Sequence, residues 1–387
     1  MAPAPIDPSI TEFVVPKKDT LGLPEPALKR LTKAGIDLSE GYPYRPSRPL
    51  YIQDIYNIRN RDRVHVDPGS RADKSKSALF SAATKVTDLT AHIGTEIEGL
   101  QLKDLTDQQK DELGLLIAER SVVFFRDQDL SPQQQKALGE YYGEVEVHPQ
   151  TPQVPGLPGV TVIWPDLQAT EHGASFRSPG GASRWHTDLV HERNPAGVTH
   201  LHNDTVPPIG GDTLWASGYG AYEKLSPEFR KYIDGKQAVY RSSHSYLDRD
   251  NPTSGPQYLE RVHPLVRVHP ATGWRALWVN RAMTVRIVGL DKAESDLILG
   301  YLFDVYEKNI DIQVRFKWTP GTSALWDNRI TIHNASWDYG GRHPRHGTRV
   351  TSLAEVPYFD PSAPTRREAL GLLGPDEKQV DGVLVET

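Results

Sequence analysis

The second half of the sequence is divided into short segments rich in β-branched and aromatic residues, separated by turn-forming residues. Six such segments stand out: residues 197–204, 212–217, 276–280, 314–318, 323–328 and 349–356. One clear amphipathic helical pattern, residues 291–308, lies between two of them. Many short strands with few helices predict a mostly β fold with flanking helices, built as a β-sandwich or jelly roll.

The segment upstream of these strands reads as helix, strand, helix. Thr106 followed three residues later by Gln109 forms a capping-box pattern, so we expect a helix to begin there. The apolar run SVVFFRDQ (121–128) predicts a buried strand. Ser131 as N-cap with Pro132 in the first turn predicts a second helix.

The composition excludes several classes of protein. The chain has no cysteine, so disulfides, thiolate zinc sites, iron–sulfur clusters and a cysteine nucleophile are ruled out. A net charge of −6 without a basic cluster argues against nucleic acid and anionic membranes as partners. No apolar run long enough to cross a bilayer and no signal-peptide pattern is present, so we expect a cytoplasmic protein. Neither GxGxxG nor GxxxxGK[ST] occurs, which leaves a Rossmann or P-loop nucleotide site unsupported.

Two further regions have a distinct texture. Residues 1–80 are rich in Pro, Lys, Arg and Asp, and we expect an N-terminal extension that packs on a main domain of residues 81–387. Residues 151–184 are rich in Gly and Pro and predict a long loop, which acts as a lid over an active site or is only a surface excursion.

His186 and Asp188 form the first half of a candidate metal site. Side chains at positions i and i+2 of a strand face the same side, so this imidazole and carboxylate can be directed at one point. His333, in LWDNRITIH, is the best candidate for the third ligand. Two histidines and one carboxylate on one face leave three coordination positions open, which suits non-haem Fe(II) that binds a cosubstrate and O₂. Zinc accepts the same three groups, so the spacing alone leaves the metal open.

Three arginines follow His333 in WDYGGRHPRHGTRVTSL, namely Arg342, Arg345 and Arg349. Arginines beside a metal suit the bidentate capture of a dicarboxylate or an oxyanion. A solvated basic turn is the alternative interpretation.

Taken together, these segments resemble the taurine dioxygenase (TauD/TfdA) family of Fe(II)/2-oxoglutarate-dependent oxygenases. The matching pieces run in the family's order from about Ala82 to Phe359, roughly 70% of the chain, and the first 80 residues resemble extensions in fungal members. They are FFRDQDLSPQQQKALGEYYGEVEVHP, WHTD, NPAG, GGDTLWAS, ALWVNRAMTVRIVGL, ALWDNRITIH and the closing pair of arginines. The resemblance implies a double-stranded β-helix (jelly roll) core, with Fe(II), 2-oxoglutarate and O₂ as cofactor and cosubstrates.

The resemblance also implies roles for individual residues. His186, Asp188 and His333 would hold Fe(II) and form the catalytic centre. Thr213 and Arg345 would bind the distal carboxylate of 2-oxoglutarate. Arg349 would belong to the same site and also meet the anionic group of the substrate. The other residues implied at the substrate are His148, for the anionic group, and Leu189, through its backbone N–H.

The sequence departs from the taurine-specific pattern where the family reads the substrate. Thr151 stands where an aromatic residue is usual, and a position near Ala182 where an asparagine is usual; Tyr246 and Met283 replace phenylalanines. We therefore expect a small anionic substrate other than taurine, an alkylsulfonate that is oxidised to an aldehyde and sulfite, with succinate and CO₂ formed from 2-oxoglutarate. A carboxylate such as an amino acid or an aryloxyacetate, hydroxylated or cyclised, is the alternative substrate. A non-catalytic jelly-roll binding protein is the alternative from another class. Relatives form dimers or tetramers, so we expect a homodimer or homotetramer.

The remaining histidines are weighed separately. His200 and His202 alternate with Leu201 on a predicted core strand, and we expect them to be structural. His191 either lines the mouth of the site or is structural as well.

Overall fold

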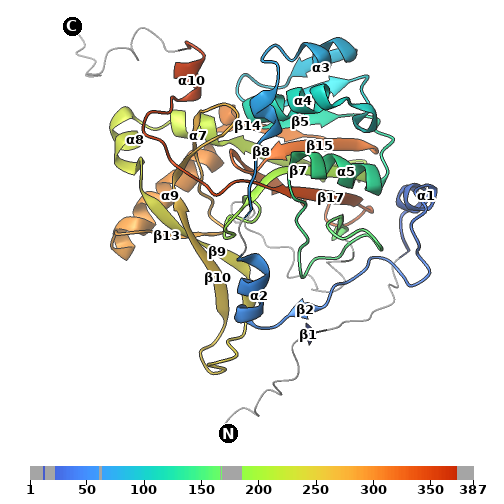
Figure 1. The fold of residues 1–387 in the computed structure, drawn as a ribbon, viewed down its shortest axis with the longest axis horizontal. Helices are drawn as coiled ribbons and strands as arrows, with labels where there is room; N and C mark the ends of the chain where they lie inside the picture. Colours follow the sequence, from blue (N-terminus) through green and yellow to red (C-terminus); the bar gives the residue numbers. More distant parts are fainter. Residues whose placement is uncertain (1–11, 14–21, 61–62, 166, 168–184, 373–387) are drawn as a thin grey trace.

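The computed structural model describes residues 12–13, 22–60, 63–165, 167 and 185–372 (Figure 1). The strands are β1 (Glu12–Phe13), β2 (Arg48–Pro49), β3 (Lys85–Asp88), β4 (Thr95–Glu98), β5 (Val122–Phe125), β6 (Thr161–Ile163), β7 (Ala196–Thr205), β8 (Thr213–Ser217), β9 (Gln237–Tyr246), β10 (Gln257–Pro264), β11 (Val266–Val268), β12 (Arg275–Leu277), β13 (Thr284–Ile287), β14 (Gln313–Phe316), β15 (Thr322–Asp327), β16 (Thr331–Ala335) and β17 (His346–Leu353). The α-helices are α1 (Glu25–Lys33), α2 (Ile52–Arg59), α3 (Ser77–Ala82), α4 (Asp107–Arg120), α5 (Pro132–Tyr142), α7 (Gly218–Glu223), α8 (Pro227–Ile233), α9 (Lys292–Lys308) and α10 (Arg366–Ala369).

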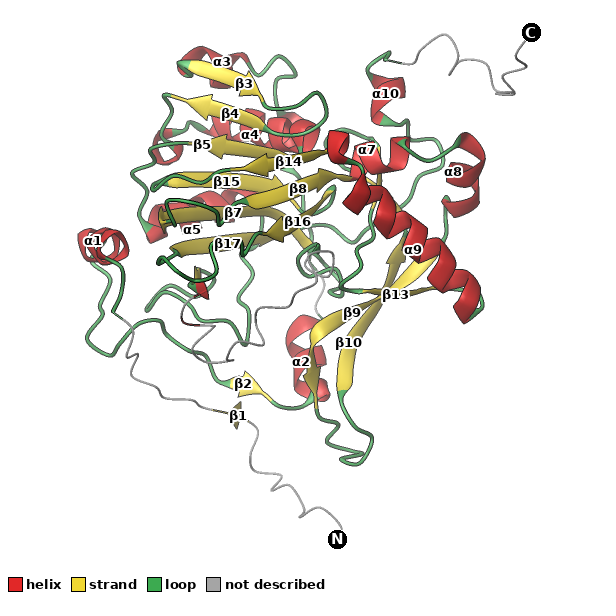
Figure 2. Cartoon of the chain, turned by 180° about the vertical axis from the view of Figure 1, so that it is seen from behind, coloured by secondary structure: helices red, strands yellow, loops and turns green. Residues whose placement is uncertain are grey.

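Two sheets face each other at the centre of the molecule. The larger has the order β3-β4-β5-β15-β7-β17-β6, and the smaller has the order β14-β8-β16. Within them only β4 and β5 are parallel neighbours. Figure 2 shows the smaller sheet lying over the larger one. Aromatic and aliphatic side chains from both sheets fill the space between them, and this inner layer is the core that carries the candidate site. Its members include Phe124, Leu201, Trp215, Phe316 and Trp326.

Helices α4 and α5 cover the outer face of the larger sheet (Figures 1 and 2). Their apolar side chains, such as Leu113 of α4 and Leu138 of α5, pack with residues of β5, β7 and β15, such as Leu325. The polar residue Gln135 of α5 is fully buried here. Its side-chain amide donates to the main-chain carbonyls of His200 and Thr348, and these hydrogen bonds offset the cost of burying it. The inner face of this sheet is therefore left to the functional residues.

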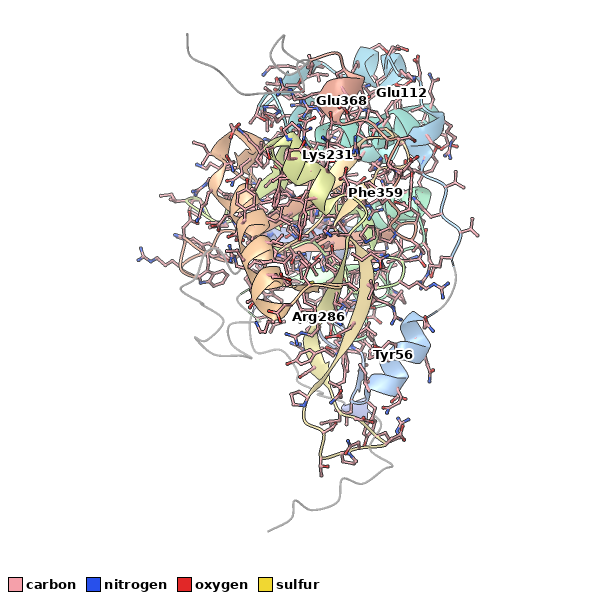
Figure 3. All side chains as sticks on the ribbon, turned by 90° about the vertical axis from the view of Figure 1, so that its left-hand side faces the viewer. Tyr56, Glu112, Lys231, Arg286, Phe359 and Glu368 are labelled. Carbon is pink, nitrogen blue, oxygen red and sulfur yellow. The ribbon has the colours of Figure 1, made fainter. Side chains whose placement is uncertain are left out.

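A third sheet, of order β10-β9-β13, extends to one side and packs against α9. The side chains of α9 and of this sheet form one apolar core cluster, which also contains Trp185 and Val190. These two residues flank the His-x-Asp triplet, so α9 and this sheet support the site from one side. Figure 3 shows Tyr56 of α2 beside the β9–β10 hairpin at one end of the molecule, with Glu112 of α4 at the opposite end.

The secondary structure predicted for residues 106–142 is confirmed. Helix α4 begins after a complete capping box between Thr106 and Gln109, and α5 begins after another between Ser131 and Gln134. Strand β5 between them is fully buried. The predicted strands of the second half and the helix at 291–308 are present as well, as β7, β8, β12, β14, β15, β17 and α9. The mostly β expectation holds in a coarser form, as a mixed α/β fold with several antiparallel sheets.

Two helices in the N-terminal segment were not predicted. Helix α1 has nine residues and α2 has eight, about two turns each, so the apolar spacing of each is too short to stand out from the surrounding sequence. Both are stabilised by contacts with distant segments: Arg30 of α1 donates to the carbonyl of Leu130, and Ile55 of α2 packs with Tyr246 of β9. In short helices, tertiary contacts rather than local propensity supply the stability.

Within the described ranges, no helix has both the length and the apolar character needed to cross a membrane.

Candidate metal centre

A backbone bridge brings the two halves of the candidate metal site together. His186 and His333 form an isolated antiparallel β-bridge, in which the N–H of His186 donates to the carbonyl of His333 (3.0 Å) and the N–H of His333 donates back (2.8 Å). Residues directly opposite each other in an antiparallel pair project to the same side. The two imidazole rings accordingly lie with their centroids 4.2 Å apart.

Asp188 completes the set from the position two residues after His186. Nε2 of His186 lies 3.7 Å from Oδ1 of Asp188, and one ligand atom from each of the three side chains lies within 4.8 Å of the others. His333 is buried, whereas the side chains of His186 and Asp188 are 31% and 13% exposed, so the site opens on the His186 side. Two imidazoles and one carboxylate at this spacing fit a divalent transition metal.

The electrostatics of the three groups favour metal binding over proton binding. Burial raises the pKa of the Asp188 carboxyl, but the positive charge of Arg349 and the nearby His333, His186 and His148 outweigh it and lower that pKa to about 2. Burial lowers the pKa of His333 to about 3, which keeps its imidazole neutral. Nδ1 of His333 is buried and has no hydrogen-bond partner among the described residues. An ionised carboxylate and a neutral imidazole are the forms that bind a metal.

The turn between β15 and β16 holds the His-x-Asp triplet in place. The hydroxyl of Thr187 donates to the carbonyl of Thr331 (2.7 Å), and the backbone N–H of Asp188 donates to Oδ1 of Asn328 (3.2 Å). The amide of Asn328 donates to the carbonyl of Gly197 and the hydroxyl of Thr199 on β7. One short turn therefore positions all three candidate ligands, because His333 follows it directly on β16.

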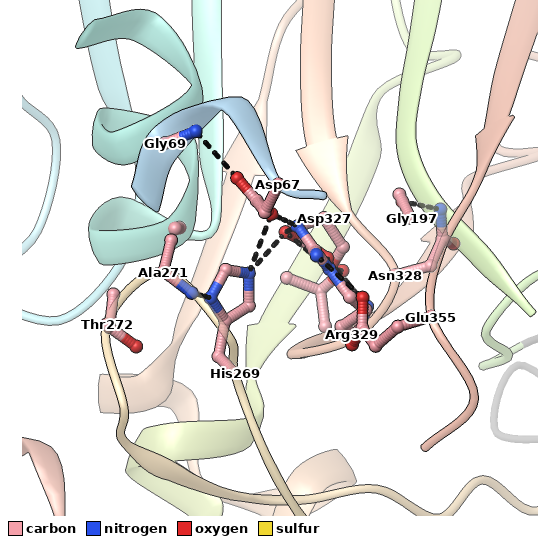
Figure 4. Close-up of polar contacts among 12 residues, drawn as sticks. Asp67, Gly69, Gly197, His269, Ala271, Thr272, Asp327, Asn328, Arg329 and Glu355 are labelled. Atoms are coloured by element: carbon pink, nitrogen blue, oxygen red, sulfur yellow. Dashed lines mark hydrogen bonds and ion pairs between the residues drawn. The ribbon is translucent and has the colours of Figure 1, made fainter. Parts of the chain in front are cut away.

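A second cluster of metal-type side chains lies behind this turn, but an arginine occupies its centre. Asp67, His269 and Asp327 are within reach of one metal ion. Figure 4 shows the guanidinium of Arg329 between the two carboxylates, 2.5 Å from Asp67 and 2.5 Å from Asp327, with Glu355 3.1 Å away on its other side. His269 donates through Nε2 to Asp327 because its Nδ1 accepts from the N–H of Ala271. The cluster is a buried ion-pair network, and it ties the segment around Asp67 to the β15–β16 turn.

The residues expected at the cosubstrate lie on the inner layer. Thr213 on β8 is buried, and its hydroxyl oxygen accepts from Nε1 of Trp318 (3.0 Å), which leaves the hydroxyl hydrogen available to a carboxylate. Arg345 is buried immediately before β17. Arg349 on β17 reaches the metal-ligating group: its Nη1 lies 3.2 Å from Oδ2 of Asp188.

The residues expected at the substrate differ in how directly the structure links them to the candidate metal ligands. His148 is close enough to Asp188 to influence its pKa, and its Nδ1 accepts from the N–H of Gln150. Leu189 adopts a left-handed backbone with φ of 55°, a sharp turn straight after Asp188. The hydroxyl of Thr151 is buried with no partner among the described residues.

The two apolar substrate positions fall into different clusters. Met283 packs against the cluster that contains Trp185. Tyr246 packs instead with Ile52, Ile55 and Leu259. Ala182 and the rest of residues 168–184, half of the expected lid, lie outside the described residues.

The histidines expected to be structural face away from the site. His200 and His202 both contact the hydroxyl of Ser323 at 3.0 Å on the outer side of the larger sheet, and burial lowers the pKa of His200 to about 3. His191 lies 3.6 Å from the carboxylate of Glu192.

Two neighbours of the site were missed. The ring of His244 lies 5.7 Å from that of His148, and Trp318 supports Thr213. Strand alternation in RSSHSY (241–246) could have indicated His244, whereas nothing local distinguishes Trp318 from other core tryptophans.

Comparisons with known proteins identify the family of the chain. The profile described as "Taurine catabolism dioxygenase TauD, TfdA family" matches residues 85–351. A Schizosaccharomyces pombe protein named as an alpha-ketoglutarate-dependent sulfonate dioxygenase is 36% identical over 341 residues, 85% of this chain and 84% of that protein. An alpha-ketoglutarate-dependent sulfonate dioxygenase of Saccharomyces cerevisiae is 34% identical over 304 residues, 76% of this chain and 74% of that protein. The crystal structure of a taurine dioxygenase from Burkholderia xenovorans matches with a TM-score of 0.62 at 35% identity, over 72% of this chain and 92% of that one. All three candidate metal ligands fall within the matched residues 85–351.

Proposed function

Because the chain belongs to the taurine catabolism dioxygenase (TauD/TfdA) family, we propose that it uses Fe(II), α-ketoglutarate and O₂ to hydroxylate a small organic anion, an alkylsulfonate. It is an α-ketoglutarate-dependent dioxygenase. The observation that carries the proposal is the convergence of His186, Asp188 and His333 with Arg349 against Asp188.

In this proposal His186, Asp188 and His333 would hold Fe(II), and a set of three protein ligands suits a metal that also binds a cosubstrate. The bound metal and α-ketoglutarate supply the oxidising chemistry, in which O₂ is consumed and the cosubstrate becomes succinate and CO₂. The protein contributes the orientation of its ligands. The bridge between His186 and His333 fixes the two imidazoles relative to each other, and Arg349 keeps Asp188 ionised.

Thr213 and Arg345 bind the distal carboxylate of α-ketoglutarate in this proposal. The hydroxyl of Thr213 can donate because its oxygen is already engaged by Trp318, and a buried guanidinium gives a charge-assisted partner to a carboxylate. Arg349 contributes to the same site from its place beside Asp188.

The proposed substrate is an alkylsulfonate, whose anionic head meets His148 and Arg349, with the backbone N–H of Leu189 nearby. Hydroxylation of the carbon next to sulfur places a hydroxyl and a sulfonate on one carbon, and loss of sulfite from that carbon leaves an aldehyde. Thr151, at the position that meets the amine in taurine-specific members, and Tyr246 and Met283, at the apolar positions, are the proposed determinants of the rest of the substrate. The support is the positive charge beside Asp188 and the sulfonate dioxygenases among the relatives.

We also propose the larger organisation that the family suggests. The two facing sheets form a double-stranded β-helix (jelly roll) core within a catalytic domain of residues 81–387. Residues 1–80 are an extension that packs on this domain, and residues 151–184 act as its lid. The chain acts as a homodimer or homotetramer.

The test is a substrate panel with the iron-loaded protein. Alkylsulfonates of increasing length, amino acids and an aryloxyacetate are each supplied with α-ketoglutarate, and succinate and sulfite are measured in parallel. The proposal predicts equal amounts of succinate and sulfite with at least one alkylsulfonate, and neither product with Asp188→Ala. If a carboxylate gives succinate and no alkylsulfonate gives sulfite, that carboxylate would replace the alkylsulfonate as the proposed substrate. An Asp188→Ala variant with unchanged turnover would overturn the metal assignment.

A further inference from the structure

Asn203 presents an unexplained polar group in the interior. Its side chain is fully buried, yet neither Nδ2 nor Oδ1 has a hydrogen-bond partner among the described residues. A buried amide without partners destabilises a fold, so native structures satisfy such groups with protein, water or a ligand. The amide can donate two hydrogen bonds and accept others, and this capacity is unused.

Strand register places this side chain on the inner layer. Asn203 follows Leu201 by two residues on β7, and Leu201 packs with Trp215 of the opposite sheet, so both project between the sheets. Its cross-strand neighbours are Thr322 on β15 and Gly347 on β17. Asn203 therefore faces the same interior as Thr213 and His333, which lie on the opposing sheet.

Gly347 leaves the space that the amide occupies. A Cβ at position 347 would lie 2.4 Å from Oδ1 of Asn203, so the amide lies over the backbone of this glycine. Gly347 stands midway between Arg345 and Arg349. A rise of about 3.4 Å per residue puts it ~7 Å along the strand from Arg349, a separation comparable to the length of a five-carbon dicarboxylate.

Asn203 and Thr213 lie at the same end of the inner layer. The carbonyl of Asn203 accepts from the N–H of Gly321 (2.8 Å), in the short connection that also contains Trp318. Trp318 in turn donates to the hydroxyl of Thr213 (3.0 Å). Arg349, by contrast, lies two residues beyond Gly347 on β17, and its guanidinium contacts the carboxylate of Asp188, a candidate metal ligand.

We infer that Asn203 is a further binding residue for α-ketoglutarate, whose Nδ2 donates to the carboxylate farther from the metal. The inference rests on the proposed function of the site and adds a neutral amide donor to Thr213 and Arg345. A carboxylate accepts up to four hydrogen bonds, so a hydroxyl, a guanidinium and an amide can all donate to one such group. Gly347 is required at this position because a Cβ would lie 2.5 Å from the main-chain carbonyl oxygen of His202, and its lack of a side chain also leaves room for the amide.

The experiment uses Asn203→Leu, which keeps the branching of the side chain at Cγ and replaces its two polar atoms with larger methyl groups, and Asn203→Asp, which opposes one carboxylate with another. Each Mn(II)-loaded protein is titrated with α-ketoglutarate without O₂ by calorimetry. Loss of a hydrogen bond to a charged group predicts about 10- to 100-fold weaker binding for Asn203→Leu, and we expect a larger loss for Asn203→Asp.

A second measurement separates this role from a structural one. The thermal midpoint of the metal-free, ligand-free Asn203→Leu protein should equal or exceed that of the parent protein, because an unsatisfied buried amide has been removed. The control is Gln135→Met, on the outer face of the same sheet, where both amide bonds are made. It should lower the midpoint and leave the affinity for α-ketoglutarate unchanged.

The outcomes distinguish the inference from the proposed function. A parent protein that fails to bind α-ketoglutarate in the presence of Mn(II) overturns the proposed function, and the inference with it. A parent protein that binds, with both Asn203 variants folded and binding equally well, overturns the inference alone. A lowered midpoint for ligand-free Asn203→Leu, like that of Gln135→Met, would likewise assign Asn203 to the structure, satisfied by water.

Discussion

Nη1 of Arg349 lies 3.4 and 3.2 Å from the two carboxylate oxygens of Asp188, across 161 residues of sequence. The pair joins strand β17 to the loop that carries the first two candidate metal ligands. One guanidinium nitrogen thus contacts both oxygens, while Nε of Arg349 has no partner among the described residues. The arginine both maintains the charge of a metal ligand and retains donor capacity for an anion beside it.

The first prediction concerns the pH dependence of stability in the metal-free protein. The pKa of Asp188, about 2, lies below its ordinary value of 3.8, so this carboxylate stabilises the fold above about pH 4, and that contribution is lost as the pH falls towards 2. Arg349→Gln removes the main favourable partner and leaves a mostly buried carboxylate. We expect the thermal midpoint of Arg349→Gln to be lower than that of the parent at pH 7.

The difference between the two midpoints should narrow as the pH falls from 4 towards 2, because protonation of Asp188 removes the charge that Arg349 stabilises. Thermal unfolding followed by circular dichroism at several pH values measures it. A difference that is constant over this range would show that the pair does not stabilise the charged form.

The second prediction is the metal stoichiometry. Of the two clusters of metal-type residues in the described part of the chain, only the one with Asp188 is free of an arginine at its centre. We expect one Co(II) or Mn(II) per chain by equilibrium dialysis. Asp188→Asn should weaken binding by at least about 10-fold. Asp67→Asn should still bind one metal. Two metals per folded chain would contradict the assignment of the Asp67 cluster as an ion-pair network.

The third prediction compares a buried and an exposed carboxylate. Asp67 is 6% exposed and lies 2.5 Å from Arg329, so Asp67→Asn should lower the free energy of unfolding by about 2–4 kcal/mol. Asp129 contacts Lys33 and Lys103, but its side chain is 60% exposed. Asp129→Asn should change the same quantity by no more than about 1 kcal/mol. Urea denaturation of both variants gives the comparison, and equal losses would contradict it.

The fourth prediction tests the packing of α5 on β17. A Cβ at Gly139 would lie 2.4 Å from Cγ1 of Val350, so Gly139→Ala should destabilise the protein by about 1–3 kcal/mol. Gly300, inside α9, has nothing within 4 Å of the same position. Gly300→Ala should stabilise the protein by about 0.5–1 kcal/mol through helix propensity. The same denaturation series measures both, and a destabilising Gly300→Ala would refute the argument.

The sequence predicted those elements whose signals are local. The capping box at Thr106 and the N-cap Ser131 with Pro132 marked helix starts to the residue, and β-branched runs marked the strands of the central sheets. Helices α1 and α2 were not predicted because each is about two turns long and depends on distant contacts for its stability. The same reason hid the Asp67–Arg329 pair, whose two members look unremarkable in sequence and are joined only by the fold.

The candidate site divides in the same way. The spacing of two residues was sufficient to pair His186 with Asp188, although the triplet lies in a loop with a single β-bridge at His186 rather than on a strand. The segment LWDNRITIH indicated His333 as the third ligand, and the resemblance to a family implied the same choice. Which groups would surround Asp188 depends on the register between β17 and its neighbours, and register over such separations has no local signature. Asn203 illustrates the limit, since its polarity could be read in the sequence but its lack of a partner could not.

The bridge between His186 and His333 is made entirely of main-chain atoms, and the consequence is evolutionary. A link that uses no side chain survives substitution at every residue around it, and it spans the whole stretch that contains the β9–β10 hairpin. Insertions and replacements in that stretch can reshape the surroundings of a substrate while the spacing of the metal ligands is preserved. A chain organised in this way can acquire new substrates by changes at its periphery, while the arrangement of the candidate metal ligands is inherited unaltered.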